Sequence, residues 1–185
     1  GRVNYPLFLL VSSTLHEASP GHHLQGAIAV ELDIHPFRSF ARFAAYHEGW
    51  ALYSESLGFE MGMYDTPYIR FGALGDEMLR ACRLVVDTGI HWKKWTREQA
   101  IQYMLENMPS TELAIVNQVD RYVAMPGQAL SYKVGQLKIE ELKSKAQAKL
   151  KDKFDIRDFH DSVLSQGTLP LDILEEIVTS WMNSV

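Results

Sequence analysis

A cluster of residue types that bind metal ions and transfer protons begins at His16, in the stretch HEASPGHHLQ. Metallopeptidase helices of the H-E-x-x-H type place two imidazoles one turn apart, so that both bind one ion while the glutamate reaches a water beside it. Here His22 follows His16 by six residues, which in an unbroken helix is about 9 Å along the axis and about 120° around it. Zn–N bonds measure about 2.0–2.1 Å, so a regular helix could not join these side chains through one ion.

A proline interrupts this stretch. Pro20 has no N–H to donate to the carbonyl group of His16, and its ring would clash there, so we expect a break or bulge in the helix. If Pro20 and Gly21 form a two-residue insert, the remaining residues read H-E-A-S-H, and His22 takes the fourth position after His16. The pattern therefore predicts His16 and His22 as metal ligands, with Glu17 as the general base.

A catalytic zinc site takes three protein ligands and leaves a position for water. Glu48 is the candidate third ligand, because it lies on a second helical segment among aromatic residues, where a carboxylate requires a partner. Its neighbour His47 is an alternative, although one residue further round the helix it should face away. Glu55, two turns after Glu48, could accept a hydrogen bond from a ligating imidazole. For the second ligand, His23 stays an alternative to His22.

The elements that must position these residues are helices. Apolar residues recur with helical spacing and no stretch alternates convincingly with period two, so the sequence predicts an all-α fold. Prolines at first helical positions and a capping box from Thr96 to Gln99 mark several helix starts. The expected helices span about 7–19, 21–32, 39–60, 67–91, 97–107, 111–124, 127–149, 155–167 and 170 onward. Without repeats or linkers, residues 1–185 are expected to form one helical domain.

Composition narrows the classes of function. The chain has 185 residues and a net charge of -5, with no basic run, which argues against a nucleic-acid partner. No apolar run approaches the roughly 20 residues of a membrane span. The single cysteine, Cys82, excludes an internal disulfide and is expected to be a small buried residue. The first residue is not Met and a key motif starts at residue 16, so we expect the C-terminal piece of a longer protein.

A stripe of charged residues follows one face of the expected helix at 67–91. Its members are spaced by three or four positions, and they are Asp76, Arg80, Arg83, Asp87 and His91. One interpretation is a series of intrahelical ion pairs on a helix surface. The other is a polar wall of an active-site cleft, in which His91 contacts substrate.

The segment RYVAMPGQALSY, which ends at Tyr132, contains a further set of candidates. Its Pro-Gly break precedes a helix and could present Tyr122, Gln128 and Tyr132 to a cleft as substrate-binding or catalytic groups. The alternative for Tyr132 is a core tyrosine whose hydroxyl is satisfied by hydrogen bonding.

Four motifs in order carry a resemblance to a known family. HEASPGHHLQ, YHEGWALYSE, RACRLVVDTGIH and MPGQALSYKVG resemble the bacterial domain-of-unknown-function 885 family over nearly the whole chain. That family is grouped with gluzincin-type zinc metallopeptidases, which implies a zincin-like helical fold whose H-E-x-x-P-G-H helix is broken at Pro-Gly. Its members are longer, with this motif in their C-terminal half and often a lipoprotein or secretory signal. The resemblance thus implies a missing N-terminal half as partner and a periplasmic, lipoprotein or secreted location.

The resemblance also implies an activity. Zinc-dependent hydrolysis of a peptide substrate is expected, with Zn2+ held by His16, His22 and Glu48 and with Glu17 as the proton acceptor. The segment around Glu48 is similar to the HESQ segment that supplies the third ligand in thermostable carboxypeptidases. Gluzincin oligopeptidases use a Gly- and Tyr-rich segment to steady the oxyanion, which favours Tyr132 for that role. The competing classes are a non-catalytic helical metal-binding or interaction module, and a metal hydrolase acting on another amide or an ester.

Overall fold

The computed structural model describes residues 6–185 of the chain, and this part is built of helices without a strand, which confirms the predicted all-α fold. In chain order the elements are η1 (Leu7–Leu9), α1 (Leu10–Glu17), α2 (His22–Glu31), α3 (Pro36–Phe40), α4 (Ala44–Glu60), α5 (Pro67–His91), α6 (Arg97–Asn107), α7 (Glu112–Ala124), η2 (Gln128–Leu130), α8 (Ser131–Leu150), η3 (Lys151–Lys153), α9 (Ile156–Leu164) and α10 (Leu171–Ser184), where η marks a short 3-10 helix.

Local signals define the helices that the sequence predicts best. Helix α5 begins at Pro67, and the Thr66 side chain accepts a hydrogen bond from the backbone N–H of Ile69. Helix α6 begins with the predicted capping box, in which Thr96 and Gln99 each accept a hydrogen bond from the other's backbone N–H. Both helices have the predicted bounds, and they begin where they do because these caps satisfy N–H groups that the first turn leaves without partners.

Other helix bounds differ from the prediction. The range 39–60 is two helices, because Pro36 starts α3 early and residues 41–43 separate it from α4. Pro36 suits a first helical turn, where its missing N–H costs nothing. Nothing in the sequence of residues 41–43 marks the interruption. The range 155–167 is shorter than predicted, since α9 ends at Leu164 and Gly167 adopts a positive φ of 68° in the following loop.

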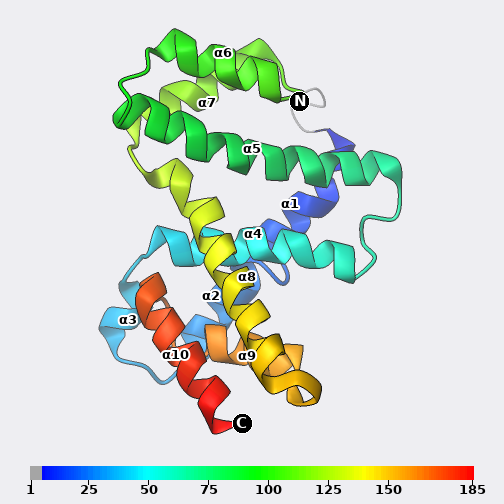
Figure 1. Ribbon diagram of the computed structural model, residues 1–185, viewed down its shortest axis with the longest axis vertical. Coiled ribbons are helices and arrows are strands. Elements are labelled where there is room, and N and C mark those ends of the chain that lie inside the picture. Colours follow the sequence, from blue (N-terminus) through cyan, green and yellow to red (C-terminus); the bar gives the residue numbers. More distant parts are fainter. Residues whose placement is uncertain (1–5) are drawn as a thin grey trace.

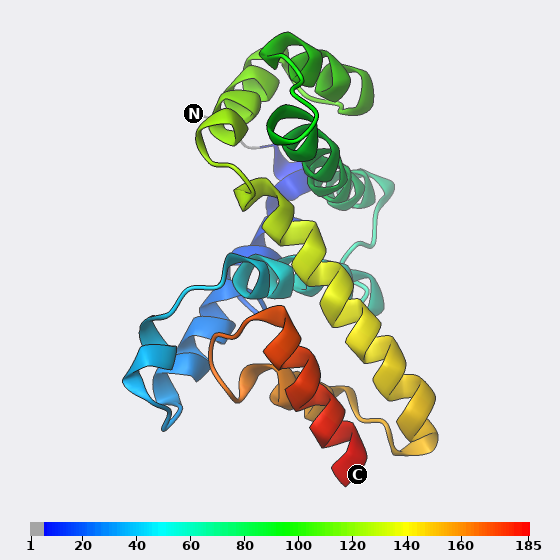
Figure 2. The same ribbon diagram turned by 60° about the vertical axis from the view of Figure 1, so that its left-hand side comes forward.

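The two larger hydrophobic cores of the described residues lie at opposite ends of the molecule, where Figures 1 and 2 show the helices that form them. The larger core joins α4, α8, α9 and α10 through buried residues that include Trp50, Phe159 and Leu174. The smaller core joins α5, α6 and α7 through residues that include Met104 and Ile115. Helix α8 runs from one core to the other, and α1 lies beside α4 and α5. The elements that carry the predicted chemistry therefore meet between the two cores.

Helices α4 and α8 touch through their backbones. A Cβ atom added to Gly49 would lie 2.4 Å from the Cα atom of Gly135, and one added to Gly135 would lie 1.8 Å from the carbonyl oxygen of Ala45. No side chain fits at either position. Because Gly49 follows Glu48 directly and Gly135 lies three residues after Tyr132, this contact brings two predicted site residues near each other.

Candidate metal centre

The predicted break in the first motif is present. Helix α1 ends at Glu17, α2 begins at His22, and the four residues between them form a loop with a cis peptide bond before Pro20. The loop is longer than the two-residue insert expected from the sequence. The indole N–H of Trp50 donates a hydrogen bond of 2.8 Å to the carbonyl oxygen of Pro20, which anchors the loop on α4. The break therefore turns the chain so that α2 starts close to the end of α1.

Gly21 is required by the close approach of this loop to α1. A Cβ atom there would lie 1.9 Å from the carbonyl oxygen of His16 and 2.4 Å from that of Leu15. We expect Gly21→Ala to displace the loop and the start of α2, to lower the free energy of unfolding by about 1–3 kcal/mol, and to weaken metal binding. Urea unfolding and metal titration measure these effects.

Gly26→Ala is the matched control for this substitution. Gly26 lies in the same helix α2 as His22, and a Cβ atom there would meet nothing within 4 Å. Alanine is favoured over glycine inside a helix by up to about 1 kcal/mol, so this variant should be at least as stable as the parent. Equal behaviour of the two variants would contradict the steric role of Gly21.

Three predicted ligands lie together where α1, α2 and α4 meet. His16 Nε2 is 3.6 Å from Glu48 Oε2, and His22 Nε2 is 3.4 Å from the same oxygen. The two imidazole rings are 4.8 Å apart between centroids and almost perpendicular, at 89°. One donor atom from each of the three side chains lies within 4.8 Å of the other two. This cluster of His16, His22 and Glu48 could hold a metal ion.

The donor set and its spacing fit zinc. Two atoms bound to a tetrahedral zinc at about 2.0–2.1 Å lie about 3.3–3.4 Å from each other, close to the two nitrogen–oxygen distances in the cluster. Two imidazoles and a carboxylate are also a ligand set that catalytic zinc sites use. The cluster is open on one side, since the side chain of His16 is 7% exposed but those of Glu48 and His22 are 20% and 29% exposed. The cluster is therefore most accessible to solvent on the side of His22.

The electrostatics of the cluster favour a cation. Burial tends to raise the pKa of Glu48, but His16 and His22 outweigh burial and hold it well below its usual range. Burial also tends to lower the pKa of His16, but hydrogen bonds with Glu48 and Glu55 raise it to about 9. The carboxylate thus stays ionised with a proton beside it. Metal ligands must be deprotonated, so a bound metal ion would take the place of that proton.

The two alternative histidines point elsewhere. His47 Nδ1 is 3.1 Å from Gln25 Oε1, and His47 Nε2 is 3.0 Å from Thr168 Oγ1, so both ring nitrogens are engaged away from the cluster. Burial lowers the pKa of His47. His23 is exposed on α2. The contact of His47 with Thr168 could not be predicted from the sequence, because Thr168 lies 121 residues further along the chain.

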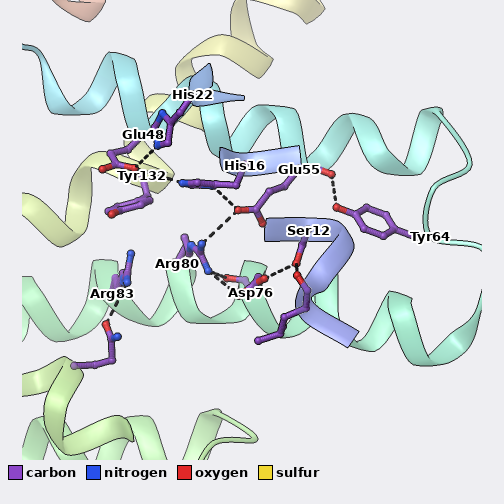
Figure 3. A network of polar contacts seen from close by, with 12 residues as sticks. Ser12, His16, His22, Glu48, Glu55, Tyr64, Asp76, Arg80, Arg83 and Tyr132 are labelled. Atoms are coloured by element: carbon purple, nitrogen blue, oxygen red, sulfur yellow. Dashed lines mark hydrogen bonds and ion pairs between the residues drawn. The ribbon is translucent and has the colours of Figure 1, made fainter. Parts of the chain in front are cut away.

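Glu17 and Glu55 occupy different sides of the cluster. Glu17 is exposed at the end of α1, directly after His16. Glu55 is buried behind the cluster, and its Oε1 lies 2.7 Å from His16 Nδ1, as the sequence suggested for a residue two turns after Glu48. This contact directs the other ring nitrogen of His16 towards Glu48 (Figure 3).

Tyr132 lies next to the cluster, with its ring 6.2 Å from that of His16 and nearly parallel to it. Its hydroxyl accepts a hydrogen bond of 3.3 Å from Gln128 Nε2. Tyr122 is more deeply buried, and its hydroxyl contacts Arg83 Nε at 3.0 Å. His91 Nε2 is 2.9 Å from the backbone carbonyl oxygen of Tyr122, at the far end of α5. The structure thus brings Tyr132 and Gln128 together beside the cluster, whereas Tyr122 and His91 form a separate contact.

The charged stripe of α5 is only in part a series of intrahelical ion pairs. Arg80 Nη1 forms the predicted intrahelical pair with Asp76 Oδ1, at 2.9 Å. Arg83 instead lies over the Tyr132 ring, with its Cζ atom 4.5 Å from the ring centroid. Both carboxylate oxygens of Asp87 accept the backbone N–H of Gly127, at 3.2 and 3.1 Å. Much of the stripe therefore contacts other elements and does not form a solvated helix surface.

Sequence comparison identifies the family. The family described as bacterial protein of unknown function (DUF885) matches residues 2–178. The chain belongs to this family. No significant match was found among curated proteins. The four motifs in the sequence indicated the DUF885 family correctly.

Two solved structures resemble this DUF885 chain. A candidate lipoprotein from Colwellia psychrerythraea is 49% identical with a TM-score of 0.95, and the match covers 97% of this chain and 31% of that one. A candidate lipoprotein of unknown function from Shewanella oneidensis is 26% identical with a TM-score of 0.88, covering 95% of this chain and 32% of the other. This DUF885 chain therefore spans about a third of the length of these relatives. Within residues 6–185, no helix is long and apolar enough to cross a membrane.

Proposed function

We propose that this DUF885 chain carries the catalytic centre of a zinc-dependent peptidase of the gluzincin type. The observation that carries the proposal is the cluster of His16, His22 and Glu48, whose nitrogen–oxygen distances of 3.4 and 3.6 Å suit one zinc ion. A glutamate directly after the first ligand, in the position of the general base of H-E-x-x-H peptidases, adds to this support. When bound, zinc would polarise a carbonyl group and lower the pKa of a coordinated water towards about 7.

Residues of the chain itself would transfer the proton, stabilise the oxyanion and contact the peptide. Glu17, exposed beside the cluster, would accept a proton from the attacking water and deliver it to the leaving amine. Tyr132, whose ring lies next to that of His16, would donate a hydrogen bond from its hydroxyl group to the oxyanion. Gln128 would orient that hydroxyl through the contact between their side chains. His91 of α5 is proposed to contact more distant parts of the peptide, whereas Tyr122 of α7 is buried and would support His91 through its backbone carbonyl oxygen.

The remainder of a longer protein would complete the cleft. The chain corresponds to about a third of each solved relative, so we propose that residues 1–185 are one helical domain from the C-terminal part of such a protein. The missing N-terminal part would form the opposite wall around the peptide. Both relatives are described as candidate lipoproteins, which supports a periplasmic, lipoprotein or secreted location for this chain.

Two measurements on a protein of full family length test the proposal together. Elemental analysis should find about one zinc per chain, and a peptide library should be hydrolysed in a reaction that a chelator stops and zinc restores. Zinc without hydrolysis of any amide or ester would indicate a non-catalytic metal-binding module. Hydrolysis restricted to other amides or esters would indicate a different metal hydrolase, and absence of both zinc and hydrolysis would reject the proposal.

A further inference from the structure

A series of polar contacts connects His16 to a second residue of the same helix (Figure 3). The carboxylate behind His16 belongs to Glu55, whose Oε1 is also 3.3 Å from Arg80 Nη2. The other terminal nitrogen of Arg80, Nη1, donates to Asp76 Oδ1. Asp76 Oδ2 in turn accepts a hydrogen bond of 2.6 Å from Ser12 Oγ. Ser12 lies one turn before His16 on α1, so the contacts form a closed circuit through α1, α4 and α5.

The charges of this circuit are largely removed from water. The side chain of Glu55 is 7% exposed, that of Arg80 13% and that of Asp76 14%. Buried charges are stable only when they are paired and hydrogen-bonded, so neither carboxylate can readily turn away from the guanidinium. The fork of an arginine can bind two acceptors in fixed directions, whereas the ammonium of lysine cannot reproduce that geometry.

Arg80 contacts the same carboxylate oxygen of Glu55 that contacts His16. Oε1 of Glu55 contacts both His16 Nδ1 and Arg80 Nη2, so the guanidinium fixes the direction in which that oxygen meets the imidazole. The backbone of Glu55 has a separate anchor, because the hydroxyl of Tyr64 donates to its carbonyl oxygen at 2.8 Å. Arg80 therefore holds the side chain of Glu55 and is not needed to hold the helix.

Arg80 also lies beside the aromatic neighbour of the cluster. Its Cζ atom is 5.8 Å from the centroid of the Tyr132 ring, which in turn lies against His16. The guanidinium of Arg80 thus contacts the carboxylate behind His16 and also lies beside the aromatic ring next to His16.

We propose that Arg80 is a positioning residue for the metal centre. By bridging Glu55 and Asp76, its guanidinium holds the Glu55 carboxylate on His16 Nδ1 and so directs His16 Nε2 to the place where Glu48 and His22 converge. This inference rests on the proposed metal site and assigns to α5 a role in metal affinity. Residues that hydrogen-bond to a metal ligand typically change metal affinity 10–100-fold when substituted, and Arg80 would act through such a residue.

Two substitutions test the role of Arg80 in the purified protein. Arg80→Lys keeps a positive charge but removes the fork, and we expect zinc affinity to fall about 10-fold or more. Asp76→Asn keeps the size of the side chain and weakens its contact with Arg80, but it leaves Glu55 itself unchanged. We therefore expect zinc affinity to fall in this variant too, by a smaller factor. Zinc affinity is measured by competition with a chromophoric chelator, and the visible spectrum of the cobalt-substituted protein reports the ligand geometry. We expect both variants to change that spectrum.

Arg97→Lys provides the matched control. Arg97 forms a bidentate pair with Asp120 at 2.5 and 3.0 Å, but this pair is exposed and lies between α6 and α7, away from the cluster. This variant should keep the zinc affinity and the cobalt spectrum of the parent.

The outcomes separate this inference from the proposed function. If Arg80→Lys and Asp76→Asn only lowered the midpoint of urea unfolding, with zinc affinity and cobalt spectrum unchanged, Arg80 would be purely structural and the inference would be overturned. A parent protein that bound no zinc would overturn the metal site itself, and this inference with it. Weaker zinc binding in both variants, with an altered cobalt spectrum and an unaffected Arg97→Lys control, would support the positioning role.

Discussion

Replacing Glu17 by glutamine is expected to abolish nearly all peptide hydrolysis in a protein of full family length, while zinc and fold are retained. Glu17 follows His16 at the exposed end of α1, about 100° further round the helix, which is the position of the general base in H-E-x-x-H peptidases. Glutamine has nearly the same size and polarity but cannot accept a proton. General-base catalysis contributes about 10²–10⁴ in rate, so turnover should fall by at least that factor.

The measurement compares kcat, zinc content and the circular dichroism spectrum of parent and variant. Hydrolysis at close to the parental rate with zinc bound would show that Glu17 is not the base. Loss of zinc together with activity would instead identify Glu17 as a ligand or a structural residue, and would favour a non-catalytic role for the site.

The second large effect concerns the ligand set. His16→Ala, His22→Ala and Glu48→Ala should each weaken zinc binding by more than about 100-fold, because each removes one of the three proposed protein ligands. This loss should exceed the roughly 10–100-fold loss typical for a residue that only hydrogen-bonds to a ligand. Competition with a chelator, combined with elemental analysis, measures the affinity.

His23→Ala and His47→Ala are the controls, since they remove an imidazole next to the cluster but not from it. His23 is exposed, and His47 contacts Gln25 and Thr168. Both variants should keep about one zinc per chain. Equal zinc retention in all five variants would eliminate the site, and loss of zinc in His47→Ala alone would reassign the third ligand.

Local rules predicted most of the fold. Capping residues, together with Pro67 in α5, defined the starts of α5 and α6, since those signals act within one turn of the chain. The break between α1 and α2 followed from the missing N–H of Pro20. The interruption at residues 41–43 could not be predicted, because no proline, glycine or capping side chain marks it.

The candidate site was predictable to the extent that its residues share a motif or a helix face. Spacing within α4 suggested that Glu55 would lie behind an imidazole, and spacing within α5 suggested the pair of Asp76 and Arg80. The contact between Arg80 and Glu55 joins two helices, and no pattern in either helix encodes how they cross. Long-range pairs of this kind depend on tertiary packing, so only the structure could supply them.

The contact between Gly49 and Gly135 has a consequence for how much sequence change the site tolerates. Most packed helices are separated by side chains, and their spacing shifts whenever one of those side chains gains or loses a methylene group. Helices α4 and α8 have no such adjustable spacer where they cross, because backbone meets backbone. We therefore expect substitutions in the surrounding core to change the separation between Glu48 and Tyr132 less than they would at a crossing spaced by side chains.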